Sequence, residues 1–144
     1  MTFIVNVEAA VVRDQQYLLI VRGANEVHAP GMLSLPGGKV EQAGDAVAVL
    51  EATLRRELRE EVGVEVADEL IYVDSTAFVA DDGQPVINVV FLCRHRAGDA
   101  RPVASDEIAQ VVWMTAAEVL ADPRTPPWAR RSVELAELRR SQLP

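Results

Sequence analysis

The sequence predicts an α/β (α+β) fold in which a mixed central sheet is covered by helices on both sides. Runs of β-branched and apolar residues, which are typical of strands, occupy the start of the chain and return after its middle. One long segment between them has apolar residues at helical spacing, and shorter helical segments end the chain. Strands and helices in this order favour a sheet with helices packed on both faces.

Length and composition indicate one folded domain over residues 1–144, because 49% of the 144 residues are hydrophobic. No apolar run approaches the length of a membrane span, and the first five residues lack the basic region of a secretory signal. Cys93 is the only cysteine, so it forms no internal disulfide and reads as a small buried side chain. We therefore expect a cytoplasmic protein with no membrane partner.

The formal net charge is -8 and the isoelectric point is about 4.7. A chain this acidic is poorly suited to bind a nucleic acid polymer, which requires neutralisation of many phosphates. The acidic composition is still compatible with small anionic substrates, because carboxylates that hold divalent cations can form a phosphate site.

Strands are expected where β-branched and apolar residues are dense and turn residues flank them. The loop at 22–31 and the Pro-Gly-Gly turn at 36–38 separate the first strands from the long helix, and Asp81-Asp82-Gly83 forms a later turn. The expected strands cover residues 3–12, 17–21, 70–79, 86–94 and 111–114.

The long helix is expected at residues 45–62, with Asp45 as its N-cap and Gly63 in the left-handed turn that ends it. Two further helices are expected at 116–120 and 128–139. The apolar side chains of the long helix are Ala46, Val47, Val49, Leu50, Leu54, Leu58 and Val62, and those of the final helix are Val133, Leu135 and Leu138.

Three glutamates lie together on the long helix. Residues three or four positions apart share a helix face, so Glu57, Glu60 and Glu61 project side by side. Their repulsion costs stability unless a positive charge neutralises it, and magnesium commonly bridges carboxylates to substrate phosphates. A solvated acidic helix face is the alternative, and the glutamates alone leave both interpretations open.

Two details favour the metal site. The opposite face of the helix is apolar, so a core would hold the carboxylates in place. Gly37 and Gly38 precede the helix in a turn whose backbone can approach a ligand closely.

These residues resemble the signature of the Nudix hydrolases (MutT-like), which is G-x5-E-x7-R-E-U-x-E-E-x-G-U, where U is aliphatic. Residues 56–64, RELREEVGV, agree with its second half at every specified position, and residues 35–41, LPGGKVE, resemble its usual lead-in. The order of strands and helices along nearly all of the chain also agrees with the α/β/α sandwich of that family.

The chain departs from the signature between its two halves. Gly38 and Arg56 lie 18 positions apart (56 minus 38), which is four more than in the signature. The first glutamate of the signature is therefore unplaced, and Asp45 and Glu51 are the nearest acids. A longer loop before the helix would absorb the extra residues without moving the later glutamates.

The resemblance implies a divalent metal site with Mg²⁺ as the expected ion and Mn²⁺ as an alternative. Glu57, Glu60 and Glu61 match the metal ligands, and Arg56 matches an arginine that orients a glutamate, unless it is an ordinary surface arginine. The catalytic set is then Arg56, Glu57 and Glu60.

Substrate contacts are expected from the glycine turn, Gly37 and Gly38, and from Lys39 and Arg22 toward phosphate. Arg22 matches by location only, and a solvent-facing role is its alternative. Trp128, after two prolines, could stack on a base, or pack the final helix onto the core instead.

The implied reaction is substitution at phosphorus, in which bound metal ions polarise phosphate oxygens and lower the pKa of a bound water. A general base deprotonates that water. Glu57 is the first candidate for the base, and Glu107, ahead of the strand at 111–114, is the second unless it is a plain surface acid.

The expected activity is magnesium-dependent hydrolysis of a phosphoanhydride in a small nucleotide-like substrate, and we favour a nucleoside triphosphate pyrophosphohydrolase. A nucleotide sugar, ADP-ribose or dinucleoside polyphosphate hydrolase is an alternative, and so is a nucleotide-sensing module without catalysis. Family members often form homodimers, but no interface can be named from this sequence.

Overall fold

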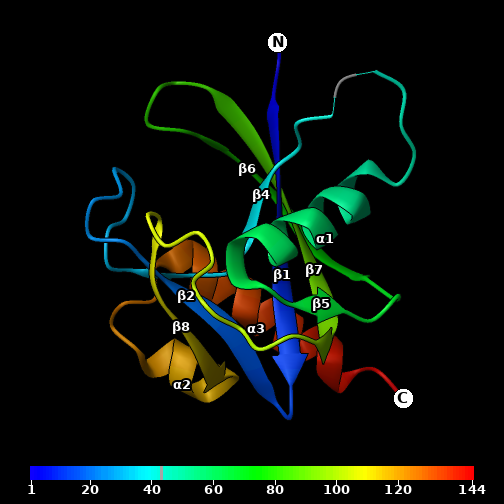
Figure 1. Cartoon of the computed structure of the whole chain (residues 1–144), viewed down its shortest axis with the longest axis vertical. Helices are drawn as coiled ribbons and strands as arrows, with labels where there is room; N and C mark the ends of the chain where they lie inside the picture. The colour runs from blue at the N-terminus through cyan, green and yellow to red at the C-terminus, as the bar shows by residue number, and fades with distance from the viewer. Residues whose placement is uncertain (43) are drawn as a thin grey trace.

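The computed structural model describes residues 1–42 and 44–144, and these form a mixed sheet between two helix layers. Helix α1 (Val49–Val62) lies in front of the sheet and α3 (Pro127–Ser141) lies behind it, as Figure 1 shows. The short helix α2 (Ala116–Ala121) begins at Thr115, whose side chain forms a capping box with Glu118. The predicted α/β/α arrangement is therefore confirmed.

Eight strands form the sheet, in the order β3-β2-β1-β7-β5, with β4 paired to β1, β6 to β7 and β8 to β2. Strands β1 and β7 run parallel, and the remaining pairs run antiparallel. The strands are β1 (Ile4–Arg13), β2 (Gln16–Arg22), β3 (Leu33–Ser34), β4 (Gly37–Lys39), β5 (Glu65–Val66), β6 (Ile71–Val79), β7 (Pro85–Ala97) and β8 (Ile108–Thr115).

The five longer strands were predicted, but the structure extends β8 beyond residues 111–114 and adds the short strands β3, β4 and β5. A strand of two or three residues has too little sequence to show alternation. It exists because a longer neighbour offers unpaired backbone groups, as β1 does for β4.

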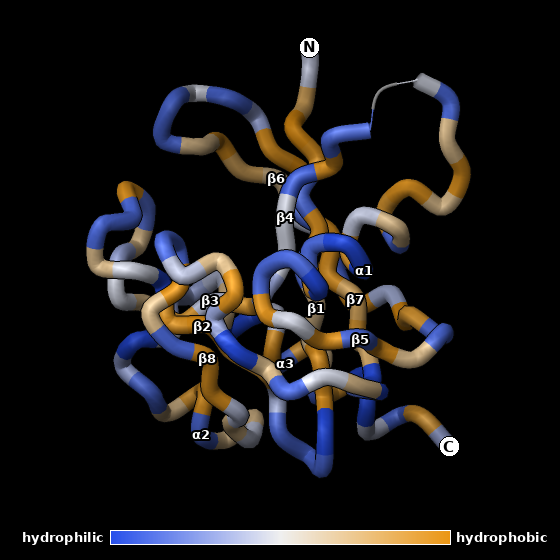
Figure 2. Tube along the Cα trace, viewed as in Figure 1, coloured by the Kyte–Doolittle hydropathy of each residue, from blue (hydrophilic) through white to orange (hydrophobic). Residues whose placement is uncertain are grey.

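The core divides between the two faces of the sheet. On the α1 face, Leu18 packs with Leu54 and Leu58 of the helix, and all three are fully buried. On the α3 face, Leu19 packs with Val133. Adjacent residues such as Leu18 and Leu19 thus serve opposite cores, which explains why the central strands are mostly hydrophobic (Figure 2).

Helix α1 begins at Val49 rather than at residue 45, so the predicted N-cap Asp45 is wrong. Ala48 occupies the N-cap position with a left-handed backbone (φ 49°) and forms no side-chain capping bond. Val47, expected on the apolar face, precedes the helix and is 92% exposed. The four extra residues therefore fall between β4 and α1, and the later glutamates keep their helical spacing.

Two further predictions about the helices have different outcomes. Gly63 ends α1 as predicted, with a φ of 73° and its amide donating to the Leu58 carbonyl at 2.9 Å. In α3, Val133 is buried but Leu138 is 55% exposed, because the buried side runs through Ala129, Ser132, Val133 and Ala136. None of the described helices is long and apolar enough to cross a membrane.

Gly37 is required where β4 meets β1. A Cβ on Gly37 would lie 2.0 Å from the Val7 carbonyl oxygen and 2.8 Å from the Glu8 Cα, and neither backbone atom can move without disrupting the sheet. Gly83, in the turn between β6 and β7, has a φ of 87° but open space around it.

We predict that Gly37→Ala lowers the free energy of unfolding by about 3 kcal/mol, which is the cost of a severe steric conflict in a packed region. Gly83→Ala should lower it by only about 1 kcal/mol, because its cost is confined to the backbone conformation. Chemical denaturation of the two variants beside the wild type measures both values. Equal losses would show that the β1–β4 contact tolerates a methyl group.

Candidate active site

Helix α1 fixes the predicted carboxylates through its buried side. Leu54, Leu58 and Val62 are fully buried and anchor the helix on the sheet. Glu57 and Glu61 project from the adjoining side and are partly buried, whereas Glu60 is exposed. The three glutamates therefore lie along the boundary between the core and solvent.

The Glu57 side chain is held between strand β4, which contains Gly37 and Gly38, and Arg56. Its side chain packs so closely on Gly38 that a Cβ there would lie 2.3 Å from the carboxyl carbon. Arg56 donates to the Glu57 carboxylate at 3.1 Å and to the Lys39 carbonyl oxygen at 3.4 Å. Burial raises the pKa of Glu57, while Arg56 lowers it and the charges of Glu60 and Glu41 raise it further.

Glu61 is the most deeply placed of the three. It accepts a hydrogen bond from the Gly37 amide at 3.2 Å. Burial raises the pKa of Glu61 to about 7, and the nearby charges of Glu57 and Glu107 add to that increase, against the Gly37 bond and Arg22. The ionised carboxylate is therefore costly here in the absence of a cation.

The donor set fits a hard divalent cation. Carboxylate oxygens are the ligands that magnesium and manganese prefer, and a cation would relieve the repulsion that raises the pKa values of Glu57 and Glu61. In the described part of the chain, no three His, Cys, Asp or Glu side chains converge on one point. Glu57 is turned toward Arg56 and Glu61 toward Gly37.

A cavity of about 840 Å³ is lined in part by Glu61. Its lining also includes Gly37 and Trp128 of α3. Arg22 and Lys39, the predicted phosphate contacts, also line it, which places five of the predicted residues around one space. Gly38, Arg56, Glu57 and Glu60 are not among the residues that line the cavity.

Arg22 is positioned by its own loop. Its Nε donates to the His28 carbonyl oxygen at 2.8 Å, and its guanidinium lies 3.7 Å from the Glu26 carboxylate. The side chain is about one quarter exposed, at 27%, so it is neither buried in the core nor a freely solvated arginine.

Trp128 does not pack the final helix onto the core. It is 49% exposed, and its ring stacks on the His28 imidazole with centroids 5.5 Å apart. His28 in turn lies 3.4 Å from the Asp81 carboxylate, in the turn between β6 and β7. Three segments distant in sequence thus meet at the mouth of the cavity.

The sequence analysis missed the polar floor of the cavity, which carries Asn6, Glu8 and Asn88. A signal existed, because each interrupts an otherwise apolar strand, and Asn6 and Glu8 alternate as residues of one face do. Burial raises the pKa of Glu8, against the hydrogen bond from Asn88 and the charge of Arg22. Ser34 also lines the cavity, and its buried hydroxyl has no hydrogen-bond partner among the described residues.

The second candidate base, Glu107, is placed differently. Glu107 is exposed in the segment before β8, and its charge acts on Glu61 while its carbonyl oxygen accepts the Gly23 amide at 2.8 Å. Trp113 packs against the core on the α1 face, with the Arg13 guanidinium 4.1 Å from its ring centroid.

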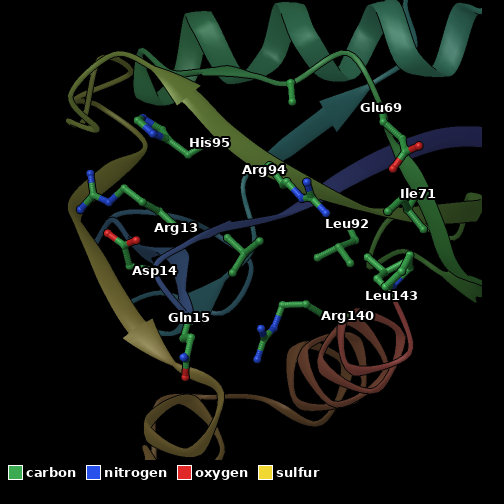
Figure 3. Close-up of a pocket in the computed structure, with 13 residues that line it drawn as sticks. Arg13, Asp14, Gln15, Glu69, Ile71, Leu92, Arg94, His95, Arg140 and Leu143 are labelled. Atoms are coloured by element: carbon green, nitrogen blue, oxygen red, sulfur yellow. The ribbon is translucent and has the colours of Figure 1, made fainter.

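A second cavity of about 520 Å³ lies at the far end of β1 (Figure 3). Arg13 and Asp14 from the β1–β2 hairpin and Arg140 from α3 border it in that view. The described residues that line it include no predicted site residue. The candidate active site is therefore at the Ile4 end of β1.

Comparison with known proteins identifies the family of this chain. The family model of the NUDIX domain matches residues 2–136. The crystal structure of a MutT NUDIX hydrolase from Burkholderia pseudomallei is 26% identical, with a TM-score of 0.78 over 94% of this chain and 98% of that one. None of the curated proteins compared with the chain matches it.

Two further structures share the fold. The MutT protein from Methanosarcina mazei Go1 is 24% identical, with a TM-score of 0.79 over 98% of this chain and 96% of that one. The NUDIX domain of Shewanella oneidensis NrtR, solved in complex with ADP ribose, is 23% identical, with a TM-score of 0.72 over 100% and 90%. Because the family model covers nearly the whole chain, the protein belongs to the Nudix family and is a Nudix hydrolase that acts on phosphoanhydrides.

Proposed function

We propose that this protein is a Mg²⁺-dependent nucleoside triphosphate pyrophosphohydrolase, which splits its substrate into a nucleoside monophosphate and pyrophosphate. The observation that carries the proposal is the cavity of about 840 Å³ whose lining includes Glu61, Gly37 and Trp128. A nucleotide site of this kind combines a carboxylate that can hold a cation with an aromatic surface that can contact the base.

The metal ligands we propose are Glu57, Glu60 and Glu61. A divalent cation bound there supplies Lewis-acid polarisation of phosphate oxygens and lowers the pKa of a bound water. Manganese is compatible with the same oxygen donors.

The protein groups have separate roles in this proposal. Arg56 keeps the Glu57 carboxylate in place through its bond at 3.1 Å, and Glu57 accepts the proton of the attacking water. Arg22 and Lys39, which line the cavity, bind the phosphates and offset the negative charge around them. Gly37 and Gly38 let the backbone approach the substrate closely.

The same carboxylates predict a link between metal and stability. Saturating Mg²⁺ should raise the melting temperature, because a ligand that binds only the native state stabilises it by about 2.7 kcal/mol at a hundredfold excess over Kd. Glu61→Gln should raise the metal-free stability by about 1 kcal/mol, since it removes a buried charge that Glu57 and Glu107 repel, and it keeps an acceptor for the Gly37 amide.

Thermal unfolding of both proteins, with and without Mg²⁺, measures these effects. The variant should lose most of the response to Mg²⁺ while gaining stability without it. If the variant keeps the full response, Glu61 is not a metal ligand.

Activity provides the direct test of function. The protein should be incubated with Mg²⁺ and a panel of nucleoside triphosphates, ADP-ribose, a UDP-sugar and a dinucleoside polyphosphate, and the released monophosphate, phosphate and pyrophosphate measured. We expect pyrophosphate from at least one triphosphate. If the protein hydrolyses only ADP-ribose, the UDP-sugar or the dinucleoside polyphosphate, the proposal is wrong and the substrate that is hydrolysed identifies the activity.

Glu57→Gln and Glu60→Gln should each reduce kcat/KM at least about 100-fold, a loss of about 2.7 kcal/mol in transition-state stabilisation. The matched control is Glu134→Gln, since Glu134 is exposed on α3 and does not line the cavity. Tight nucleotide binding without turnover in the wild type would instead support a nucleotide-sensing module.

A further inference from the structure

Ser34, in strand β3, carries a buried hydroxyl group without a hydrogen bond. The residue is 7% exposed, and its Oγ has no partner in residues 1–42 and 44–144. Two other buried hydroxyl groups are bonded: Thr125 Oγ1 donates to the Val119 carbonyl oxygen at 2.6 Å, and Ser132 Oγ donates to the Trp128 carbonyl oxygen at 3.1 Å. A buried hydroxyl that loses its bonds to water and gains no protein partner destabilises the fold, so Ser34 requires an explanation.

Strand pairing places Ser34 in the wall of the candidate active site. Ser34 lies opposite Ile20 in the antiparallel register of β2 and β3, and directly opposite residues project to the same face of a sheet. Ile20 belongs to the core on the α1 face, whereas Leu33 and Leu35, on either side of Ser34, belong to the core on the α3 face. Ser34 therefore shares the face of α1, from which Glu61 projects, and both side chains line the cavity of about 840 Å³.

An unbonded hydroxyl in the wall of a cavity has two explanations. Either it lowers stability without any function, or it completes its bonding with a molecule that fills the cavity. The hydroxyl of a serine has three staggered positions about the Cα–Cβ bond. Because Ser34 borders the cavity, one rotation about this bond can turn its hydroxyl toward a bound molecule. Its position on the face of the carboxylate helix favours the second explanation, since functional sites retain groups that reduce stability.

We propose that Ser34 is a further substrate-binding residue, and that a bound nucleotide supplies the hydrogen bond that no described protein group provides. A hydroxyl both donates and accepts, so its partner is a polar oxygen or nitrogen atom of the nucleotide. This inference rests on the proposed function, because it adds a contact to the same nucleotide site.

Stability and binding should respond to Ser34 in opposite directions. Ser34→Ala removes a buried oxygen that has no protein partner, which should stabilise the protein. The same substitution removes a contact with the nucleotide, which should weaken binding. A side chain kept only for folding would not show this combination, because its loss would lower stability.

Thermal unfolding tests the effect on stability. Ser34→Ala should raise the melting temperature by about 3 °C. Thr125→Val is the matched control, because it removes a buried hydroxyl that does have a partner and keeps the size of the side chain, so it should lower the melting temperature. If Ser34→Ala melts at or below the wild-type temperature, the hydroxyl is already bonded and the inference is wrong.

Calorimetry in the presence of Mg²⁺ tests the effect on binding, with AMP, GMP, CMP and UMP as probes. Ser34→Ala should weaken the monophosphate that binds the wild type most tightly by about fivefold, the loss of one hydrogen bond. Ser132→Ala is the control, because Ser132 lines the same cavity and is equally buried but its hydroxyl is bonded to Trp128. Its affinity should stay within about twofold of the wild type.

Pyrophosphate as an additional probe locates the contact. A loss that pyrophosphate shares assigns the hydroxyl to the phosphates that leave, whereas a loss confined to the monophosphates assigns it to the nucleoside monophosphate. Unchanged affinity of Ser34→Ala for every probe, equal losses in the two serine variants, or no binding of any probe to the wild type would overturn the inference.

These measurements separate the inference from the proposed function. Monophosphates are products of ADP-ribose and UDP-sugar hydrolysis as well as of the proposed reaction, and their affinity does not depend on turnover. The fivefold loss in a protein that hydrolyses no triphosphate would overturn the proposed function and retain Ser34 as a nucleotide contact.

Discussion

The close packing of the glycine strand β4 between β1 and α1 is the contact on which the site depends. Gly37 approaches the Val7 carbonyl so closely that only a hydrogen fits, and Gly38 leaves room for the Glu57 carboxyl group. The amide of Gly37 also binds Glu61. One short strand therefore joins the sheet, contacts two carboxylates of the helix and borders the cavity of about 840 Å³.

This arrangement concentrates negative charge where burial makes it costly. Burial dominates the raised pKa values of Glu57 and Glu61, and Arg56 offsets only part of the cost at Glu57. The buried side of α1 supplies the stability that keeps these carboxylates in place. Glu57, Glu60 and Glu61 would hold a divalent cation, which would neutralise their charge and polarise the phosphate oxygens of a bound substrate.

The cavity also links groups from opposite faces of the sheet. Glu61 comes from the helix on one face, and Trp128 comes from the helix on the other. Asn6, Glu8 and Asn88 form the floor that faces α3. The carboxylate helix carries the residues that match the family signature, whereas the floor and the Trp128–His28 stack lie outside that signature.

The sequence by itself determined the sheet-and-helix order, the carboxylate face of α1 and its end at Gly63, because periodic burial and turn chemistry are local properties. It misplaced the start of α1, since Ala48 begins the helix without a capping side chain. Only the tertiary structure brings Glu8 and Asn88 within hydrogen-bond distance, because their proximity depends on the parallel register of β1 and β7. Residues 80 positions apart meet through a pairing between strands that no local pattern encodes.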